Sequence, residues 1–442
     1  MRIIIAGGGA SGLFAAYTIA CHYHRHSADM TKPDITVLDA NDVLGKKILS
    51  TGNGRCNLCN TDTDALKYYC EDNLFVKKIL AQFHYSDAMK AFNRMGVALK
   101  DKGGYVYPRS MQAATISSAL INACRLLGVK LINNCVIKSI TCVDSSNDSS
   151  SAGKAYNRHE KNNIFCIEAD KSTYYADCVI LAYGSNAGIT TDYTGTVMKS
   201  VKSLGHKLHT YLPSLCSLYV DMTKKHYADF FKKSSGVRTD IVVKAENFSY
   251  AGELQITNYG LSGIVIFQIS HIVSESLYQK KKREVKLYVD FLASYESTDV
   301  CRLLRTQHFY EKRTLLDLIS GILNGKLALA LIQLYSAMIN RQITPDVKNI
   351  SEEELLEVIS FMKNVSFYVN KTNDIAHAQV CMGGVATQEL TDNLESRLIE
   401  NLYFCGECID VDGICGGYNL MWAWATGYVV GRGIANREWK PA

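Results

Sequence analysis

A glycine-rich stretch near the N-terminus has the spacing of a dinucleotide-binding loop. Residues 7–12 read GGGASG, and the fingerprint positions are Gly7, Gly9 and Gly12. In this pattern the first glycine allows a tight turn, the second lets backbone approach a pyrophosphate, and the third lets a helix pack on a strand. Apolar, β-branched residues precede the loop and helical spacing follows it. Asp39, at the end of the next predicted strand, is placed to bind ribose hydroxyls.

A second candidate segment lies near the C-terminus. Residues 402–405 read as a short buried strand, and Gly406 and Glu407 follow as a turn. A carboxylate at such a turn can accept hydrogen bonds from sugar or ribityl hydroxyls. Gly416 and Gly417 then precede a predicted helix, whose N-terminus would stabilise the negative charge of a reduced flavin.

Two C-x-x-C pairs raise the question of metal or redox chemistry. Cys56 and Cys59 form one pair, and Cys405 and Cys408 form the other. Zinc sites usually combine pairs that are some tens of residues apart, whereas these lie near opposite ends of the chain. Both pairs fall in glycine-rich turns that favour small side chains. We expect reduced thiols without sulfur chemistry and predict no metal site, with redox or metal use as the alternative.

Composition indicates a soluble globular protein. The chain has 442 residues, of which 47% are hydrophobic and 21% charged, with a net charge of +5. The charge is mild and scattered, which favours a small-molecule substrate over a nucleic-acid partner. The uncharged segment 413–431 approaches the length of a membrane span, but its five glycines favour a buried helix. We therefore predict a cytoplasmic protein with no membrane partner, and no oligomeric state is predicted.

The order of the predicted elements indicates an α/β domain that is split between the two ends of the chain. A polar stretch at 144–163 lies between two predicted strands and is expected to be the tip of a long hairpin. The predicted boundaries are residues 1–190 and 370–442 for the cofactor domain, 191–296 with a strand near 365–370 for a β-rich substrate domain, and 297–364 for a helical subdomain.

Seven segments together resemble the BaiN/RdsA-type NAD(P)/FAD-dependent oxidoreductases, a family that includes aminoacetone-oxidase-like flavoproteins. The segments are GGGASGL, GKKILSTGNGRCNLCN, GYVYPRSMQAATI, SLGHKLHTYLPSL, GELQITNYGLSG, AQVCMGGV and YFCGECIDVDGICGGYNLMWAWATGYVVG. They span nearly the whole chain in the family's order. The resemblance implies an α/β fold with a split Rossmann-type FAD-binding domain, an inserted β-rich domain and a helical subdomain.

The resemblance also implies which residues bind FAD. The glycine loop would hold the pyrophosphate, Val136 would meet the adenine through its backbone, and Glu407 would bind the ribityl chain. The implied cofactor residues are Gly7, Gly9, Ala10, Ser11, Gly12, Asp39, Lys47, Gly54, Arg55, Cys56, Asn57, Val136, Gly184, Gly406, Glu407, Gly417, Tyr418, Asn419 and Leu420. Tyr183, Tyr259 and Ser262 are candidates for the substrate pocket. Tyr183 is a departure, because the family's ATGG is AYGS here. No catalytic acid or base is identified.

These features predict an FAD-dependent oxidoreductase. The preferred reaction is NAD(P)H-dependent reduction of an activated C=C or carbonyl in a small or hydrophobic substrate. The first alternative is an oxidase of aminoacetone-like amines that produces hydrogen peroxide, and the second is a non-catalytic flavin-binding module. The complete dinucleotide fingerprint occurs once, so NAD(P)H is expected only as a transient co-substrate.

Overall fold

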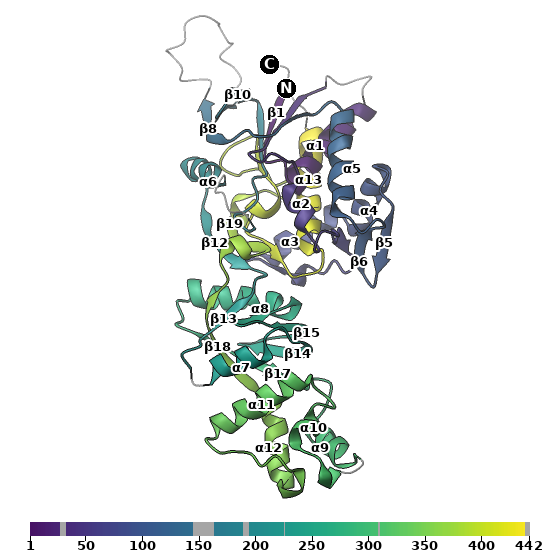
Figure 1. Cartoon of the computed structure of the whole chain (residues 1–442). Coiled ribbons are helices and arrows are strands. Elements are labelled where there is room, and N and C mark those ends of the chain that lie inside the picture. The colour runs from purple at the N-terminus through teal and green to yellow at the C-terminus, as the bar shows by residue number, and fades with distance from the viewer. Residues whose placement is uncertain (27–31, 145–162, 189–193, 225, 308–309, 438–442) are drawn as a thin grey trace, which may run out of the picture. The chain divides into compact units, whose positions relative to one another are not determined.

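The computed structural model describes residues 1–26, 32–144, 163–188, 194–224, 226–307 and 310–437. The chain divides into two compact units. The first contains Met1–Tyr211 and Val380–Ala442, and the second contains Leu212–Gln379. Figure 1 shows the first and last parts of the chain, purple and yellow, interleaved in the first unit. The two ends of the sequence therefore build one domain.

A parallel sheet forms the centre of the first unit, with strand order β20-β11-β1-β2-β7. The strands are β1 (Arg2–Ala6), β2 (Asp34–Leu38), β7 (Lys130–Ile132), β11 (Cys178–Leu181) and β20 (Leu402–Phe404). Residues Ile3, Ile4 and Ile5 of β1 are all buried. Continuous apolar runs are typical of parallel strands that are covered on both faces. Because β20 comes from the C-terminal segment, the sheet itself needs both ends of the chain.

Helices α1 (Ala10–Arg25) and α13 (Tyr418–Ala435) pack side by side, as Figure 1 shows. Small residues allow this close approach. A Cβ atom added to Gly427 would lie 2.5 Å from the carbonyl oxygen of Ser11, and one added to Gly431 would lie 2.7 Å from Cβ of Thr18. The buried helix predicted within segment 413–431 is therefore present as α13. Among the described residues, no helix is long and apolar enough to cross a membrane.

The remaining elements of the first unit surround this core. The predicted hairpin strands β8 and β9 pair antiparallel, for example Cys142 with Phe165, while the predicted tip lies outside the described residues. The bounds are α2 (Lys46–Ser50), β3 (Cys59–Asn60), β4 (Tyr68–Tyr69), α3 (Asn73–Gln82), α4 (Tyr85–Arg94), β5 (Leu99–Lys102), β6 (Tyr105–Pro108), α5 (Ala113–Leu126), β8 (Ile137–Asp144), β9 (Asn163–Ala169), β10 (Thr173–Ala176), α6 (Thr194–Ser203), β12 (Leu208–Ser214), β19 (Val380–Val385) and β21 (Asp412–Gly413).

The second unit is a closed barrel with helices, and its strand order is β13-β16-β15-β14-β17-β18. The strands are β13 (Leu218–Val220), β14 (Arg238–Ala245), β15 (Phe248–Ile256), β16 (Gly260–Ser262), β17 (Val285–Asp290) and β18 (Val365–Thr372). The helices are α7 (Tyr227–Ser234), α8 (Ile264–Ser274), α9 (Ser297–Arg305), α10 (Leu315–Ile319), α11 (Gly325–Met338) and α12 (Glu352–Met362).

The unit boundaries differ from the predicted ones for two physical reasons. Helix α6 belongs to the first unit, because Ser200 Oγ accepts a hydrogen bond from the N–H of Ile140 in β8 (3.0 Å). The chain therefore passes from the first unit to the second after Tyr211, and not at residue 190. The expected β-rich and helical parts share one hydrophobic core, in which Leu287 of the barrel and Val300 of α9 are both buried. They form a single unit, which continues to Gln379.

Candidate functional site

The glycine loop leaves an open space at the N-terminus of α1. Gly7 has φ +119°, and an added Cβ would lie 2.2 Å from the carbonyl oxygen of Ala182. An added Cβ at Gly12 would lie 2.0 Å from the carbonyl oxygen of Gly7. Gly9 is different, because a Cβ there would meet no atom within 4 Å. Gly9 is also the N-cap of α1 and provides no side-chain cap. Free helix N–H groups beside an open space fit a phosphate group.

Asp39 ties this loop to the end of β2. Its Oδ2 accepts a hydrogen bond from the N–H of Gly8 (2.6 Å), and its Oδ1 accepts from the backbone and side-chain N–H groups of Asn41 (2.8 and 3.0 Å). The carboxylate is half-buried and binds the residue next to Gly9, where the open space lies. Its contact with a ribose stays a prediction.

Residues 51–57 form a tight left-handed loop. Positive φ angles occur at Gly52, Asn53, Gly54 and Cys56. The N–H groups of Gly54 and Cys56 both donate to the carbonyl oxygen of Thr51 (3.0 Å each), and Gly54 accepts from the N–H of Ala113 at the start of α5 (2.7 Å). Gly54 and Arg55 are exposed, whereas Cys56 and Asn57 are buried. The loop therefore turns from the surface into the core within two residues.

Asn57 supplies an unsatisfied buried acceptor where this loop meets α13. Its Oδ1 is buried and has no hydrogen-bond partner in the described structure. A Cβ added to Gly417, the N-cap of α13, would lie 3.0 Å from this atom and 2.8 Å from the backbone carbon of Cys59. A buried amide oxygen without a donor is costly. The position therefore fits a ligand that offers an N–H or O–H group, as FAD does.

Lys47 and Glu407 form an ion pair that joins the two candidate segments. Nζ of Lys47 lies 2.6 Å from Oε2 of Glu407, and both side chains are partly buried. The other carboxylate oxygen of Glu407 accepts hydrogen bonds from Ser185 Oγ (2.6 Å) and from the N–H of Cys381 (3.2 Å). Sequence reasoning missed Ser185, although it is part of the AYGS departure. Glu407 is fixed by its own chain, so only its remaining lone pairs can meet a ligand.

Three other predicted cofactor residues have partners within the chain. The side-chain amide of Asn419 closes a ring with Gly413, donating to its oxygen (2.7 Å) and accepting from its N–H (2.8 Å). The carbonyl oxygen of Tyr418 accepts from the hydroxyl of Tyr68 (3.0 Å). The N–H of Val136 donates to the carboxylate of Asp170 (3.1 Å). Adenine would have to displace that carboxylate to use the same N–H.

The three substrate-pocket candidates are divided between the units. Tyr183 lies in the first unit, where burial raises the pKa of its hydroxyl well above the usual value. Its hydroxyl makes no hydrogen bond of normal geometry, although Tyr211 is its polar neighbour. Tyr259 and Ser262 belong to the second unit, where the Tyr259 hydroxyl donates to Ser217 Oγ (3.3 Å). Their role in one pocket stays a prediction.

The cysteine pairs are buried as thiols. Burial raises the pKa of Cys56 and of Cys59 to about 12, and that of Cys405 to about 12 as well. Burial also raises the pKa of Cys408 well above its usual value. Reactive cysteines need the opposite shift. Among the described residues, no group of three or more His, Cys, Asp or Glu side chains is arranged to hold a metal ion.

Cys56 and Cys59 should therefore resist alkylation in the folded protein. A thiol with a pKa of about 12 is thiolate in roughly one molecule in ten thousand at pH 8. Iodoacetamide treatment followed by peptide mass spectrometry should label the partly exposed Cys166, which serves as the internal control, before Cys56 and Cys59. Rapid labelling of Cys56 or Cys59 in protein that retains its circular dichroism would contradict the expectation and support a redox role.

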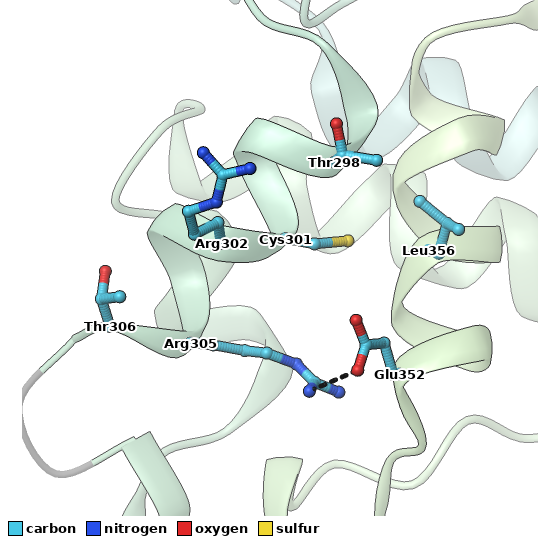
Figure 2. Close-up of a pocket in the computed structure, with 7 residues that line it drawn as sticks. All are labelled: Thr298, Cys301, Arg302, Arg305, Thr306, Glu352 and Leu356. Atoms are coloured by element: carbon cyan, nitrogen blue, oxygen red, sulfur yellow. Dashed lines mark hydrogen bonds and ion pairs between the residues drawn. The ribbon is translucent and has the colours of Figure 1, made fainter.

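The helical part of the second unit contains a pocket of about 330 Å³. Figure 2 shows its lining, which comes from α9 and α12 and includes Arg302, Cys301 and the ion pair between Arg305 and Glu352 (2.8 Å). None of the residues predicted for the cofactor or the substrate lines this pocket.

The Rossmann-type fold of the first unit and the family of the chain identify it as a flavin-dependent oxidoreductase. The chain belongs to the HI0933-like protein family, whose Rossmann-domain model matches residues 1–433. This confirms the family predicted from the sequence motifs.

Individual relatives resemble the chain over nearly its whole length. The 3-dehydro-bile acid delta(4,6)-reductase of Clostridium scindens is 38% identical over 99% of both chains. The ribosomal RNA dihydrouridine synthase of Haemophilus influenzae is 24% identical over 98% of both chains. Among solved structures, 3-ketosteroid delta1-dehydrogenase from Sterolibacterium denitrificans aligns over 98% of this chain and 99% of its own, with 11% identity and a TM-score of 0.49.

Proposed function

We propose that the protein uses FAD and NAD(P)H to reduce a carbon–carbon double bond conjugated to a carbonyl, in a small or hydrophobic substrate. The observation that carries the proposal is the 38% identity, over 99% of both chains, to a 3-dehydro-bile acid delta(4,6)-reductase. That name describes double bonds placed next to a ketone. The name dihydrouridine synthase also describes saturation of a double bond conjugated to a carbonyl. The two relatives thus share a reaction type and differ in substrate.

The first unit contains side chains and backbone groups that could bind each part of FAD. The open space at Gly9 and the N-terminus of α1 would take the pyrophosphate, and Asp39 would meet the adenosine ribose. The buried Oδ1 of Asn57 would accept a hydrogen bond from the flavin or its ribityl chain. Lys47 would place a positive charge at the flavin side. When bound, FAD supplies hydride transfer at flavin N5.

One observation favours a second candidate, an oxidase of aminoacetone-like amines. The sequence has one complete dinucleotide fingerprint, and a dedicated nicotinamide domain would need another. An oxidase needs only FAD, an amine and oxygen. A cytoplasmic location stays a prediction. The absence of a nucleic-acid partner also stays a prediction, because one relative is named for action on ribosomal RNA.

Anaerobic reduction of the flavin separates the two candidates. The flavin absorbance should bleach within seconds after mixing with NADH or NADPH in a stopped-flow instrument, and much more slowly with aminoacetone. The reduced protein should then regain its colour on addition of cyclohexenone or a conjugated steroid enone. Fast bleaching by the amine and none by either nicotinamide would contradict the reductase and support the oxidase. Bleaching by neither would favour the non-catalytic alternative.

A further inference from the structure

His209 and Asp410 form a hydrogen-bonded pair in the first unit. Nδ1 of His209, on β12, lies 2.5 Å from Oδ2 of Asp410, and each side chain is 22% exposed. A carboxylate can only accept, so Nδ1 carries the hydrogen, and Nε2 is the ring nitrogen that does not face Asp410. No hydrogen bond to Nε2 is formed by the residues that the structure describes. A carboxylate that fixes one imidazole nitrogen and leaves the other available is a common arrangement for proton transfer.

The pair lies beside the Lys47–Glu407 ion pair. Strand β19 donates to both carboxylates from alternate residues: the N–H of Cys381 to Glu407 (3.2 Å) and the N–H of Gly383 to Asp410 (2.8 Å). Alternate residues of a strand are about 7 Å apart and point to the same side. Glu407 and Asp410 therefore lie side by side along the edge of β19.

Contacts of β12 place His209 at the same location. A Cβ added to Gly383 would lie 2.3 Å from the carbonyl oxygen of Thr210, so β12 packs directly against β19 there. Tyr211, two residues after His209 and on the same side of β12, donates to the carbonyl oxygen of Gly184 (3.2 Å). Gly184 precedes Ser185, which binds Glu407. His209 therefore lies in the same part of the first unit as Lys47 and Glu407, which are predicted to bind the flavin and ribityl part of FAD.

A second histidine shows what a purely structural imidazole looks like in this fold. Nδ1 of His206 lies 2.8 Å from Oε2 of Glu389, and its Nε2 lies 3.0 Å from Oγ of Ser396. Its side chain is fully buried. Both nitrogens are satisfied and neither can reach a ligand. His209 differs in both respects.

We propose that His209 is the proton donor of the reduction and that Asp410 is its positioning residue. This inference rests on the proposed function. When bound, the reduced flavin would supply the hydride that forms a C–H bond at the β carbon, and the π electrons of the double bond would move to the α carbon and carbonyl oxygen. The Nε2–H bond of protonated His209 then breaks, its proton bonds to the α carbon, and the imidazole keeps the electron pair. A proton from water restores the imidazolium. NAD(P)H is the overall reductant.

Separate measurement of the two half-reactions tests the assignment. His209→Asn retains an N–H donor for Asp410 but has no group at the Nε2 position. Bleaching of the flavin by NAD(P)H should stay within about twofold of wild type, because that step needs no substrate proton. Reoxidation of the reduced enzyme by cyclohexenone should slow by about 100-fold or more. Asp410→Asn should slow reoxidation by a smaller factor, and His24→Gln, an exposed histidine at the end of α1, should change neither rate.

The outcomes distinguish the assignment from the proposed function. If His209→Asn is reoxidised by the enone at the wild-type rate, the proton-donor role of His209 is overturned and the proposed function is not. An equal loss in both half-reactions, with ferricyanide reoxidation slowed as well, also overturns it, because a general defect of the cofactor site would explain the loss. A wild-type enzyme that is not reoxidised by any enone overturns the proposed function and the proton-donor assignment together.

Discussion

Gly9→Val is expected to yield a folded protein without flavin. Gly9 has φ −81° and ψ −165°, an extended conformation open to any residue, and no atom lies within 4 Å of an added Cβ. The fold should therefore tolerate the side chain. If the pyrophosphate lies at this position, the valine methyl groups occupy its space and exclude it. The absorbance of bound flavin should disappear, while far-ultraviolet circular dichroism and the apparent size in gel filtration stay as in wild type.

A graded series strengthens this test. Gly9→Ala adds only the Cβ and should weaken FAD binding less than valine does. Gly12→Ala serves as the opposite case, because its Cβ would lie 2.0 Å from the carbonyl oxygen of Gly7 and should damage the fold itself. A Gly9→Val protein that retains full flavin content would show that the cofactor does not lie against this loop.

Gly427→Ala is expected to destabilise the first unit. The added Cβ would lie 2.5 Å from the carbonyl oxygen of Ser11 and 3.1 Å from the N of Ala15, so the backbones of α1 and α13 must separate. Forced overpacking of this kind costs about 1–3 kcal/mol. We expect the free energy of unfolding to fall by about that amount, as measured by chemical denaturation. The flavin should also be held less tightly, because α1 carries the end of the glycine loop.

Gly433 provides a matched control on the same helix. A Cβ there would lie 3.4 Å from Cβ of Asn393, which is an ordinary contact. Gly433→Ala should therefore leave the stability unchanged or raise it by up to about 1 kcal/mol, because alanine favours the helix. Equal effects of the two substitutions would mean that close packing of α1 and α13 does not limit stability.

Local patterns in the sequence predicted the strand–loop–helix unit, the hairpin strands and α13, because each depends on residues close together in the chain. The ion pair between Lys47 and Glu407 joins residues 360 positions apart, and His209 meets Asp410 across 201 positions. No local pattern encodes such pairs. The division after Tyr211 also depends on contacts between distant residues, such as the hydrogen bond from the N–H of Ile140 in β8 to Ser200 Oγ of α6.

The candidate site shows a similar division. Glycine spacing predicted that a pyrophosphate can approach the backbone at Gly9, and the open space found there agrees with the local steric requirements of such a turn. The partners of Asn419 and Val136 were not predicted, since a polar side chain or backbone N–H can bind either a ligand or its own chain. Only the folded structure shows that Gly413 and Asp170 already occupy these groups.

Identification of the bound flavin tests the central claim most directly. The purified protein is denatured by heat, and the released flavin is separated by chromatography and quantified per chain. We predict FAD in a ratio approaching one per wild-type chain, and none in Gly9→Val. Recovery of FMN alone, or no flavin after reconstitution of the wild-type protein with FAD, would contradict the assignment of the glycine loop and Asp39 to the adenosine diphosphate half of FAD.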